Sequence, residues 1–294
     1  TSCRSAAFLN VAIAAAGFGA FLRGLRPLGP AAAATVAQRI AASALRDPAS
    51  RARRLALFVT GFSTMGMEVV WMRIYPTVLG TFVYSFAAVV AIYLLATTFG
   101  STLYRLLRRR EFAGRMGVWF PWLCAASLLP LLPASITFPP INSILRVSIG
   151  LVPFCALLGF LTPALVDREA GDDAAAVGRA YGINLLGCLL GPLVAGFVLL
   201  PVFGTRATAG ALALPLFVIL ITPAVRRDGH LVWSLAAVAA AAGVLFSTTL
   251  FEEGFPEAQV RRDHVATVVA VGTGMDKQLY VNGVGMTALT TVTK

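Results

Sequence analysis

Long apolar segments recur along this chain and are separated by short polar connections. About 20 apolar residues are enough for a helix to cross the hydrocarbon core of a bilayer. The chain is 58% hydrophobic and only 13% charged, whereas a soluble domain has roughly 25% charged residues. The sequence therefore predicts an all-α polytopic membrane helix bundle with seven or eight transmembrane helices, and the candidate spans are 6–22, 55–79, 82–103, 117–136, 147–166, 180–200, 207–225 and 231–250.

The predicted domain organisation follows from these segments. Residues 1–22 are expected to be a first transmembrane segment that ends a truncated N-terminal half, and residues 23–54 an arginine-rich cytoplasmic linker. Residues 55–250 are expected to form a seven-helix transmembrane domain, and residues 251–294 to begin a truncated extramembrane β-domain. The first segment shows no clear cleavage pattern, so it is not interpreted as a signal peptide. Because the chain does not begin with methionine, we expect it to be a piece of a longer protein.

Arginine residues mark one side of the predicted bundle. They cluster in the connections 23–54, 105–115 and 226–227, whereas the alternate connections are almost uncharged. The positive-inside rule then places the arginine-rich connections in the cytoplasm of a multi-pass protein, expected in the bacterial inner (plasma) membrane. The same count places the tail after Leu250 on the outer face. The net charge of +11 is thus interpreted as a topology signal, with a lipid bilayer rather than nucleic acid as the partner.

The tail differs from the rest of the chain because it contains β-branched runs. Residues 263–271 and 278–281 are predicted strands, joined by the turn residues 272–276, and Asn282 and Gly283 close the second strand. The sequence therefore predicts a short C-terminal β-hairpin, which alone is marginally stable in water and is expected to have no core to pack on. The carboxylates that precede it are expected to form a solvated face: Glu252, Glu253 and Glu257.

Three polar residues within the predicted spans form the candidate intramembrane site: Glu68, Arg73 and Asn184. A charge at the centre of a membrane helix costs about 2.5–3.5 kcal/mol on insertion scales, so it is usually paired or faces a polar cavity. Two interpretations of Glu68 and Arg73 stay open: a substrate or proton site, and a structural ion pair between the two. Gly187 and Gly191 have the G-x-x-x-G spacing that allows close helix approach, and we expect Asn184 to make an interhelical hydrogen bond there.

The cysteines and histidines are spread along the sequence, so neither a disulfide framework nor a zinc site is predicted. The cysteines are interpreted as small buried apolar residues. We expect this chain to hold no catalytic residue, no metal and no cofactor. The cysteines are Cys3, Cys124, Cys155 and Cys188, and the histidines are His230 and His264.

A series of stretches resembles, in order, the membrane part of fused transporter-like/spermidine synthase proteins: 58–62, 68–73, 78–81, 99–101, 178–187, 191–192, 196–197 and 199–201. The tail looks like the small β-domain that precedes the synthase's catalytic domain, in residues 262–268, 279–283 and 286–287. The resemblance covers most of 55–294. It implies a polyamine aminopropyltransferase-like protein, in which decarboxylated S-adenosylmethionine donates an aminopropyl group to a diamine such as putrescine.

The sequence departs from that family where the chemistry would lie. No G-x-G-x-x-G loop follows a predicted strand, and Ala266 and Met286 stand where soluble synthases carry glutamines near the substrate. We therefore expect the membrane portion of a spermidine synthase-like protein, not catalytic by itself. Decarboxylated S-adenosylmethionine is implied as co-substrate only for a missing C-terminal synthase-like domain, and a homo-oligomer stays open. The alternatives are half of a small-solute transporter of major-facilitator-like type, or a membrane anchor or scaffold.

Overall fold

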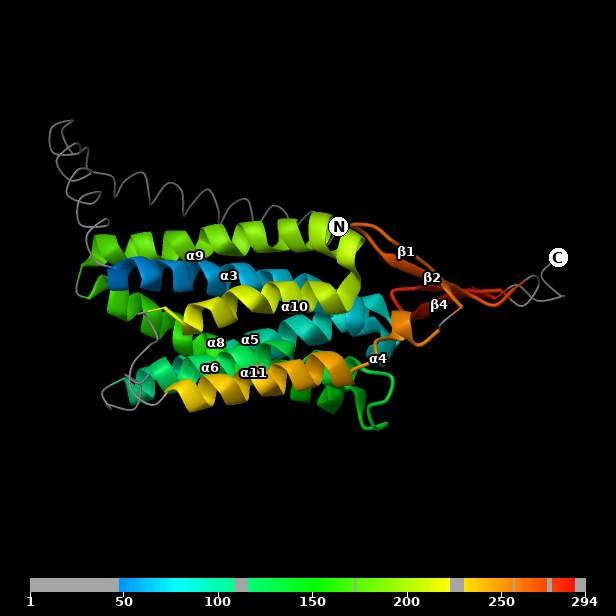
Figure 1. Ribbon diagram of the computed structural model, residues 1–294, viewed down its shortest axis with the longest axis horizontal. Coiled ribbons are helices and arrows are strands. Elements are labelled where there is room, and N and C mark those ends of the chain that lie inside the picture. The colour runs from blue at the N-terminus through cyan, green and yellow to red at the C-terminus, as the bar shows by residue number, and fades with distance from the viewer. Residues whose placement is uncertain are drawn as a thin grey trace, which may run out of the picture. The chain divides into compact units, whose positions relative to one another are not determined.

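The computed structural model describes residues 48–108, 116–171, 173–222, 230–255, 257–273 and 277–288, and these are mostly helical (Figure 1). The chain divides into two compact units, residues 1–47 and 48–294, and the structure described below belongs to the second. The predicted span 6–22, most of the predicted linker 23–54 and the arginine-rich connections near 110 and 226 lie outside the described residues.

Within the described ranges, seven helical segments carry the apolar runs from residue 55 onward, and each predicted span there is helical over most of its described length. The bounds are α3 (Pro48–Ile74) with α4 (Pro76–Leu79), α5 (Phe82–Leu107), α6 (Met116–Leu128) with α7 (Leu131–Ala134), α8 (Ser143–Ala170), α9 (Ala174–Val194) with the π-helical turn η2 (Ala195–Leu199), α10 (Leu200–Leu220) and α11 (His230–Ser247).

In the described part of the chain, four helical stretches are long and apolar enough to cross a membrane: Pro48–Leu79, Phe82–Leu107, Ser143–Ala170 and Ala175–Leu220. Two apolar helices are shorter, Val118–Ala134 and Leu231–Ser247. The run from Ala175 to Leu220 is not one straight helix, because Gly204 has φ 75° and ψ −179°, a conformation that glycine adopts readily. The chain reverses there, and α10 returns along the bundle against α3 (Figure 1). These features fit a helical membrane protein.

The last part of the predicted linker is helical, because α3 begins at Pro48. Its first turns are held by Glu169 of α8, whose side chain is only 6% exposed. Arg53 and Arg54 make ion pairs with the two carboxylate oxygens, at 3.0 and 2.5 Å. A nearly buried carboxylate needs such partners. The ion pairs with Arg53 and Arg54 therefore hold the part of α3 that precedes the apolar run against α8.

The helices α3 and α9 pack backbone to backbone. A Cβ atom at Gly187 would collide with the carbonyl oxygen of Phe58 and lie 2.8 Å from the amide nitrogen of Phe62. One at Gly191 would collide with the Phe62 carbonyl and lie 3.0 Å from the nitrogen of Gly66. Small residues at both positions let the two backbones touch, and the packing interpretation of the G-x-x-x-G spacing is confirmed.

The tail forms a four-stranded antiparallel sheet in the order β1-β2-β3-β4, with β1 (Gln259–Arg262), β2 (Thr267–Val271), β3 (Gln278–Val281) and β4 (Val284–Ala288). The predicted hairpin is confirmed as β2 and β3, although the first strand is shorter than predicted. The outer strands escaped prediction because β1 is short and charged and β4 contains Gly285. Asn282 and Gly283 have φ 46° and 79° and connect β3 to β4, as a two-residue turn of this sequence favours.

The sheet packs against the end of the helix bundle, so the expectation that it has no core is wrong (Figure 1). Phe251 and Phe255, from the segment after α11, cluster with Tyr280 of β3, and the ring centroids of Phe251 and Tyr280 are 5.1 Å apart. Val269 of β2 is only 1% exposed. Burial of these side chains stabilises a small sheet that would be marginal alone.

Candidate functional site

The two charged residues of the predicted site do not form an ion pair. Glu68 and Arg73 are five residues apart on α3, which places their side chains about 140° apart around a helix of 3.6 residues per turn. Glu68 is partly buried in the body of α3. Arg73 instead faces the sheet. The hypothesis of mutual support is therefore wrong, and the two residues belong to different sites.

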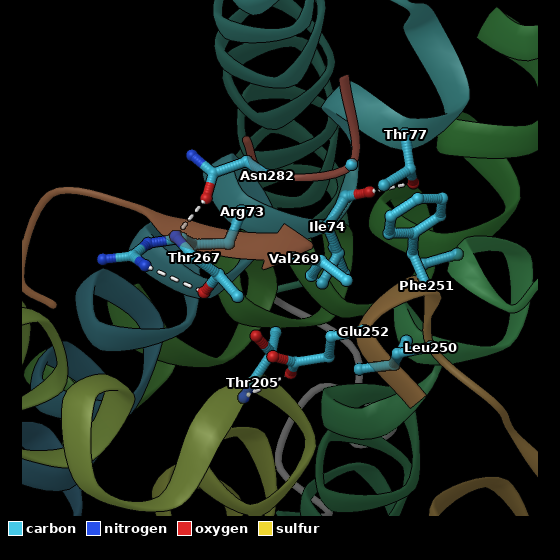
Figure 2. Close-up of a pocket in the computed structure, with 12 residues that line it drawn as sticks. Arg73, Ile74, Thr77, Thr205, Leu250, Phe251, Glu252, Thr267, Val269 and Asn282 are labelled. Carbon is cyan, nitrogen blue, oxygen red and sulfur yellow. Dashed lines mark hydrogen bonds between the residues drawn. The ribbon is translucent and has the colours of Figure 1, made fainter. Parts of the chain in front are cut away.

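Arg73 is the centre of the joint between the bundle and the sheet (Figure 2). Its side chain is nearly buried, at 7% exposed. Nη1 donates to Thr267 Oγ1 at 3.2 Å, and Nη2 donates to the main-chain oxygen of Asp263 at 2.8 Å. The main-chain nitrogen of Thr267 donates in turn to Asn282 Oδ1 at 2.8 Å. One guanidinium thus holds the beginning of β2, and Asn282 links that point to the β3–β4 turn.

Glu252 forms a second tie in the joint, and its expected place on a solvated face is wrong. One carboxylate oxygen accepts from the main-chain nitrogen of Thr205 at 3.0 Å, and the other accepts from Arg262 Nε at 2.9 Å. The Glu252 side chain is only 7% exposed. Its partners lie beside the reversal at Gly204 and on β1, so this carboxylate connects α10, the post-α11 segment and the sheet.

Glu253 is exposed, as expected, but it also forms an ion pair with Arg206 of α10 and accepts from the main-chain nitrogen of Leu250. Glu257 is exposed, as expected. Two of the three acidic residues therefore fasten the segment after α11 to the bundle. Their partners on α10, Thr205 and Arg206, lie 47 residues away in the sequence.

Asp263 shapes the β1–β2 turn that Arg73 holds. Its Oδ1 accepts from the main-chain nitrogens of Ala266 and Val265, at 2.6 and 2.7 Å. These N–H donors, Ala266 first, lower the pKa of the Asp263 carboxyl below its ordinary value of 3.8. A depressed pKa contributes stability above the ordinary value and loses it as the pH falls through the lowered one. The stability that this hydrogen-bonded carboxylate contributes is therefore present at neutral pH.

The cavity enclosed by the joint is too small for a metabolite. Its volume is about 30 Å³, and it is lined by Arg73, Ile74, Thr205, Leu250, Val269 and their neighbours (Figure 2). A cavity needs roughly 10–15 Å³ to hold one water molecule, whereas ligand pockets usually measure about 300–1,000 Å³. The joint therefore holds at most a few waters, and it is a mechanical connection rather than a binding pocket.

A larger space lies among α3, α5, α8 and α9. This groove has a volume of about 310 Å³, which reaches the lower end of the range for ligand pockets. Its lining is unusually polar for a bundle of apolar helices. The lining residues are Thr60, Gly61, Thr64, Met65, Tyr93, Thr97, Thr98, Ser101, Leu158, Gly159, Thr162, Pro163, Tyr181, Asn184 and Cys188.

Asn184 lies at this groove and makes the interhelical hydrogen bond that was expected. Its Nδ2 donates to the main-chain oxygen of Leu57 on α3 at 2.8 Å. The Leu57 carbonyl also accepts from the Thr60 hydroxyl at 3.0 Å. Asn184 therefore joins α9 to α3 and leaves its side-chain oxygen towards Cys188, whose Sγ lies 3.8 Å away.

The sequence analysis missed most of the groove's polar residues, although a signal was present. Thr60 and Thr64 are four residues apart and so lie on one face of α3. Thr97, Thr98 and Ser101 mark a similar polar face on α5. Each hydroxyl alone is unremarkable in a membrane helix, because it can bond to its own backbone. The pairing of these two faces is visible only in the fold.

The described residues offer no metal site, since no three His, Cys, Asp or Glu side chains gather closely enough among them. The cysteines that the structure describes, Cys124, Cys155 and Cys188, are unpaired thiols. Cys124 and Cys155 are fully buried, which agrees with their interpretation as small apolar residues.

No protein-family model, curated protein or solved structure matches this chain. The functional argument therefore rests on the residues of the joint and of the groove.

Proposed function

We propose that this chain is the membrane and sheet portion of a spermidine synthase-like protein, and that it anchors the sheet rather than catalysing aminopropyl transfer. The observation that supports the anchoring role is the nearly buried Arg73, which donates from α3 to both ends of the β1–β2 turn. Glu252 adds a second charged tie to the same sheet. A buried charge is costly unless its hydrogen-bonding groups are paired. These ties therefore fix the sheet in one position at the end of the bundle.

The proposed membrane domain has seven spans between residues 48 and 250, and residues 6–22 would supply an eighth. The reversal at Gly204 supports two spans within the apolar run Ala175–Leu220. The shorter apolar helix Val118–Ala134 has 17 residues, and at 1.5 Å per residue it is about 25 Å long, close to the roughly 30 Å of a hydrocarbon core. The large apolar side chains exposed on α5, α9 and η2 support contact with lipid: Phe86, Leu95, Phe99, Leu185, Leu189 and Phe197.

A first prediction concerns topology. In a variant with its native cysteines replaced, single cysteines at Ser247 and Arg109 are expected to react with an impermeant thiol reagent from opposite sides of the membrane. The reason is that α5 runs from the sheet end to the opposite end of the bundle, while α11 ends beside the sheet (Figure 1). The arginine-rich side is expected in the cytoplasm, which puts the sheet outside. Labelling of both positions from the same side would contradict this arrangement.

A second prediction concerns catalysis. Isothermal titration of the purified chain with decarboxylated S-adenosylmethionine is expected to show no saturable binding tighter than about 100 µM, or roughly −5.5 kcal/mol. The joint cavity of about 30 Å³ cannot bury a nucleoside, and ligand sites usually bury most of the ligand surface. A soluble spermidine synthase measured in the same buffer and detergent is the positive control. Saturable binding above that affinity would overturn the anchoring proposal.

A further inference from the structure

The turn between β1 and β2, residues 263–266, lies beside the sheet end of α9 and η2 (Figure 1). The ring of His264 stacks on the ring of Phe197 of η2, with centroids 5.3 Å apart and planes 15° from parallel. Phe197 is itself 63% exposed, so it faces outward from the bundle. Arg73 holds the same turn from the bundle side. The turn is thus fixed at the outer surface of the helices.

Phe197 belongs to a helical run with an apolar outer surface. The run consists of the 21 residues of α9, the five of η2 and the first four of α10, and it ends where the chain reverses at Gly204. It extends about 45 Å, which matches the roughly 40–45 Å of a bilayer with its headgroups. Near its sheet end it exposes further large apolar side chains: Leu193, Val198, Val202 and Phe203. This surface faces lipid in the membrane domain proposed above.

The position of Phe197 along the run gives the depth of the turn. Phe197 lies seven residues before Gly204, roughly 10 Å along the helix axis. The headgroup layer on each side of the hydrocarbon core is about 5–8 Å thick. With the reversal at the outer edge of the headgroups, the ring of Phe197 lies at the boundary between headgroups and acyl chains. The ring of His264, stacked on it, lies at the same level.

The turn presents side chains that suit this boundary. Val265, next to His264, is 69% exposed. A single exposed apolar residue is ordinary on a surface that faces water, but this one adjoins the residue that stacks on the lipid-facing side of the bundle. Arg261, at the end of β1 that leads into the turn, is also exposed, and arginine pairs well with phosphate. An apolar tip beside a basic residue is typical of segments that lie in a membrane interface.

We propose that the β1–β2 turn is an interfacial anchor, in which Val265 enters the outer part of the acyl chains and Arg261 contacts lipid phosphates. The inference rests on the membrane domain proposed above and adds a direct contact between the sheet and lipid. A second protein surface would also cover an apolar tip. Lipid is favoured because the turn continues the apolar surface of η2 and lies at the depth of the boundary. The sheet is then held from two sides, by Arg73 and by the bilayer.

The test is fluorescence quenching of the full chain in lipid nanodiscs, with its native cysteines replaced. A fluorophore is attached to a single cysteine at Val265, and the lipids carry bromine atoms either near the headgroups or near the chain ends. The probe at Val265 is expected to lose emission chiefly to the bromines near the headgroups. A probe at Leu189, which is 61% exposed in the middle of the helical run, is the lipid control and should lose emission chiefly to the bromines near the chain ends.

Thr273 provides the matched control in water. It is exposed in the β2–β3 turn, at the opposite end of β2 from Val265. A probe there should be quenched by aqueous iodide and by neither brominated lipid. Melting temperatures show whether each labelled variant is folded. Should Val265→Cys fail to fold, a probe at Arg261 tests the same turn and should also lose emission chiefly to the bromines near the headgroups.

Proteolysis measures how much the lipid contact contributes. Val265→Ser is expected to make trypsin cleavage after Arg261 about fivefold faster in nanodiscs, which corresponds to about 1 kcal/mol, because serine has little apolar surface to bury. Thr273→Ser, a similarly small change in the water-exposed turn, should leave the rate unchanged. Equal cleavage rates for the two serine variants would contradict the anchor.

The quenching outcomes separate this inference from the proposal on which it rests. Lipid quenching at Leu189 with none at Val265 would overturn the anchor and leave the membrane domain in place. Absence of lipid quenching at Leu189 as well would overturn both. A probe at Val265 that is shielded from bromine and from iodide alike would show that protein covers the turn, a second copy or a further part of the chain, and this would also overturn the anchor.

Discussion

Replacement of Gly187 by leucine is expected to destabilise the bundle by about 3 kcal/mol or more. A side chain at this position meets the backbone of α3, at the Phe58 carbonyl and the Phe62 nitrogen, and a backbone cannot move aside as a flexible side chain can. Overpacking of a tight core costs about 1–3 kcal/mol and occasionally more. For a chain of this size each kcal/mol lowers the melting temperature by roughly 2–4 °C. Thermal unfolding in detergent should therefore show a fall of about 6–12 °C.

Gly182 provides the matched control on the same helix. A Cβ atom there meets nothing within 4 Å, so Gly182→Leu adds a better helix former without a clash. Its melting temperature should stay the same or rise, because leucine in a helix is about 0.5–1 kcal/mol more favourable than glycine. Equal melting temperatures for the two leucine variants would show that α3 and α9 are not packed backbone to backbone.

Replacement of Arg73 by methionine is expected to release the sheet while leaving the bundle folded. Methionine keeps the length of the side chain but removes both hydrogen bonds, to Thr267 and Asp263. Hydrogen bonds to a charged donor contribute about 1.5–3 kcal/mol. A loss of about 2 kcal/mol raises the open population of the sheet about 30-fold. Trypsin should then cleave after Arg261, Arg262 or Lys277 correspondingly faster, with little change in the melting of the helices.

Arg179→Met is the control for Arg73→Met. Arg179 pairs with Asp173 at 3.3 Å, but its side chain is 40% exposed and that of Asp173 is 59% exposed. Exposed ion pairs contribute roughly 0–1 kcal/mol, so the control should cleave at the wild-type rate within the sheet. If Arg73→Met is also cleaved at that rate, Arg73 is not what holds the sheet to the bundle.

The helices could be predicted from the sequence because their signal is local. An apolar run of 20 residues has few alternatives to a helix, and the connection near Gly204 was located by the same reasoning. The strands β2 and β3 and the turn at Asn282 were likewise visible as β-branched runs and a turn dipeptide. The contact between α9 and α3 was visible in part, since Gly187 and Gly191 indicate a close approach without naming the partner helix.

The partners of the charged residues could not be predicted, because they are distant in the sequence. Arg73 and Thr267 are 194 residues apart, and Glu252 and Thr205 are 47 apart. Proximity in sequence suggested Glu68 as the partner of Arg73, but the helical twist separates them. The acidic residues after α11 resembled a solvated face because nothing local showed that the chain folds back over the reversal at Gly204. Such contacts depend on how distant parts of the chain fold against each other, which the local sequence pattern does not show.

α3 links three structures that are far apart in the chain. Its first turns are clamped by Glu169, its middle lines the groove, and its last turn grips the sheet through Arg73. A helix is stiff along its axis, and Glu68 and Arg73 are separated by less than two turns. Any sliding or rolling of α3 that widens or closes the groove must therefore carry Arg73 with it. A movement of α3 at the groove is therefore transmitted along the helix to Arg73, where α3 holds the sheet.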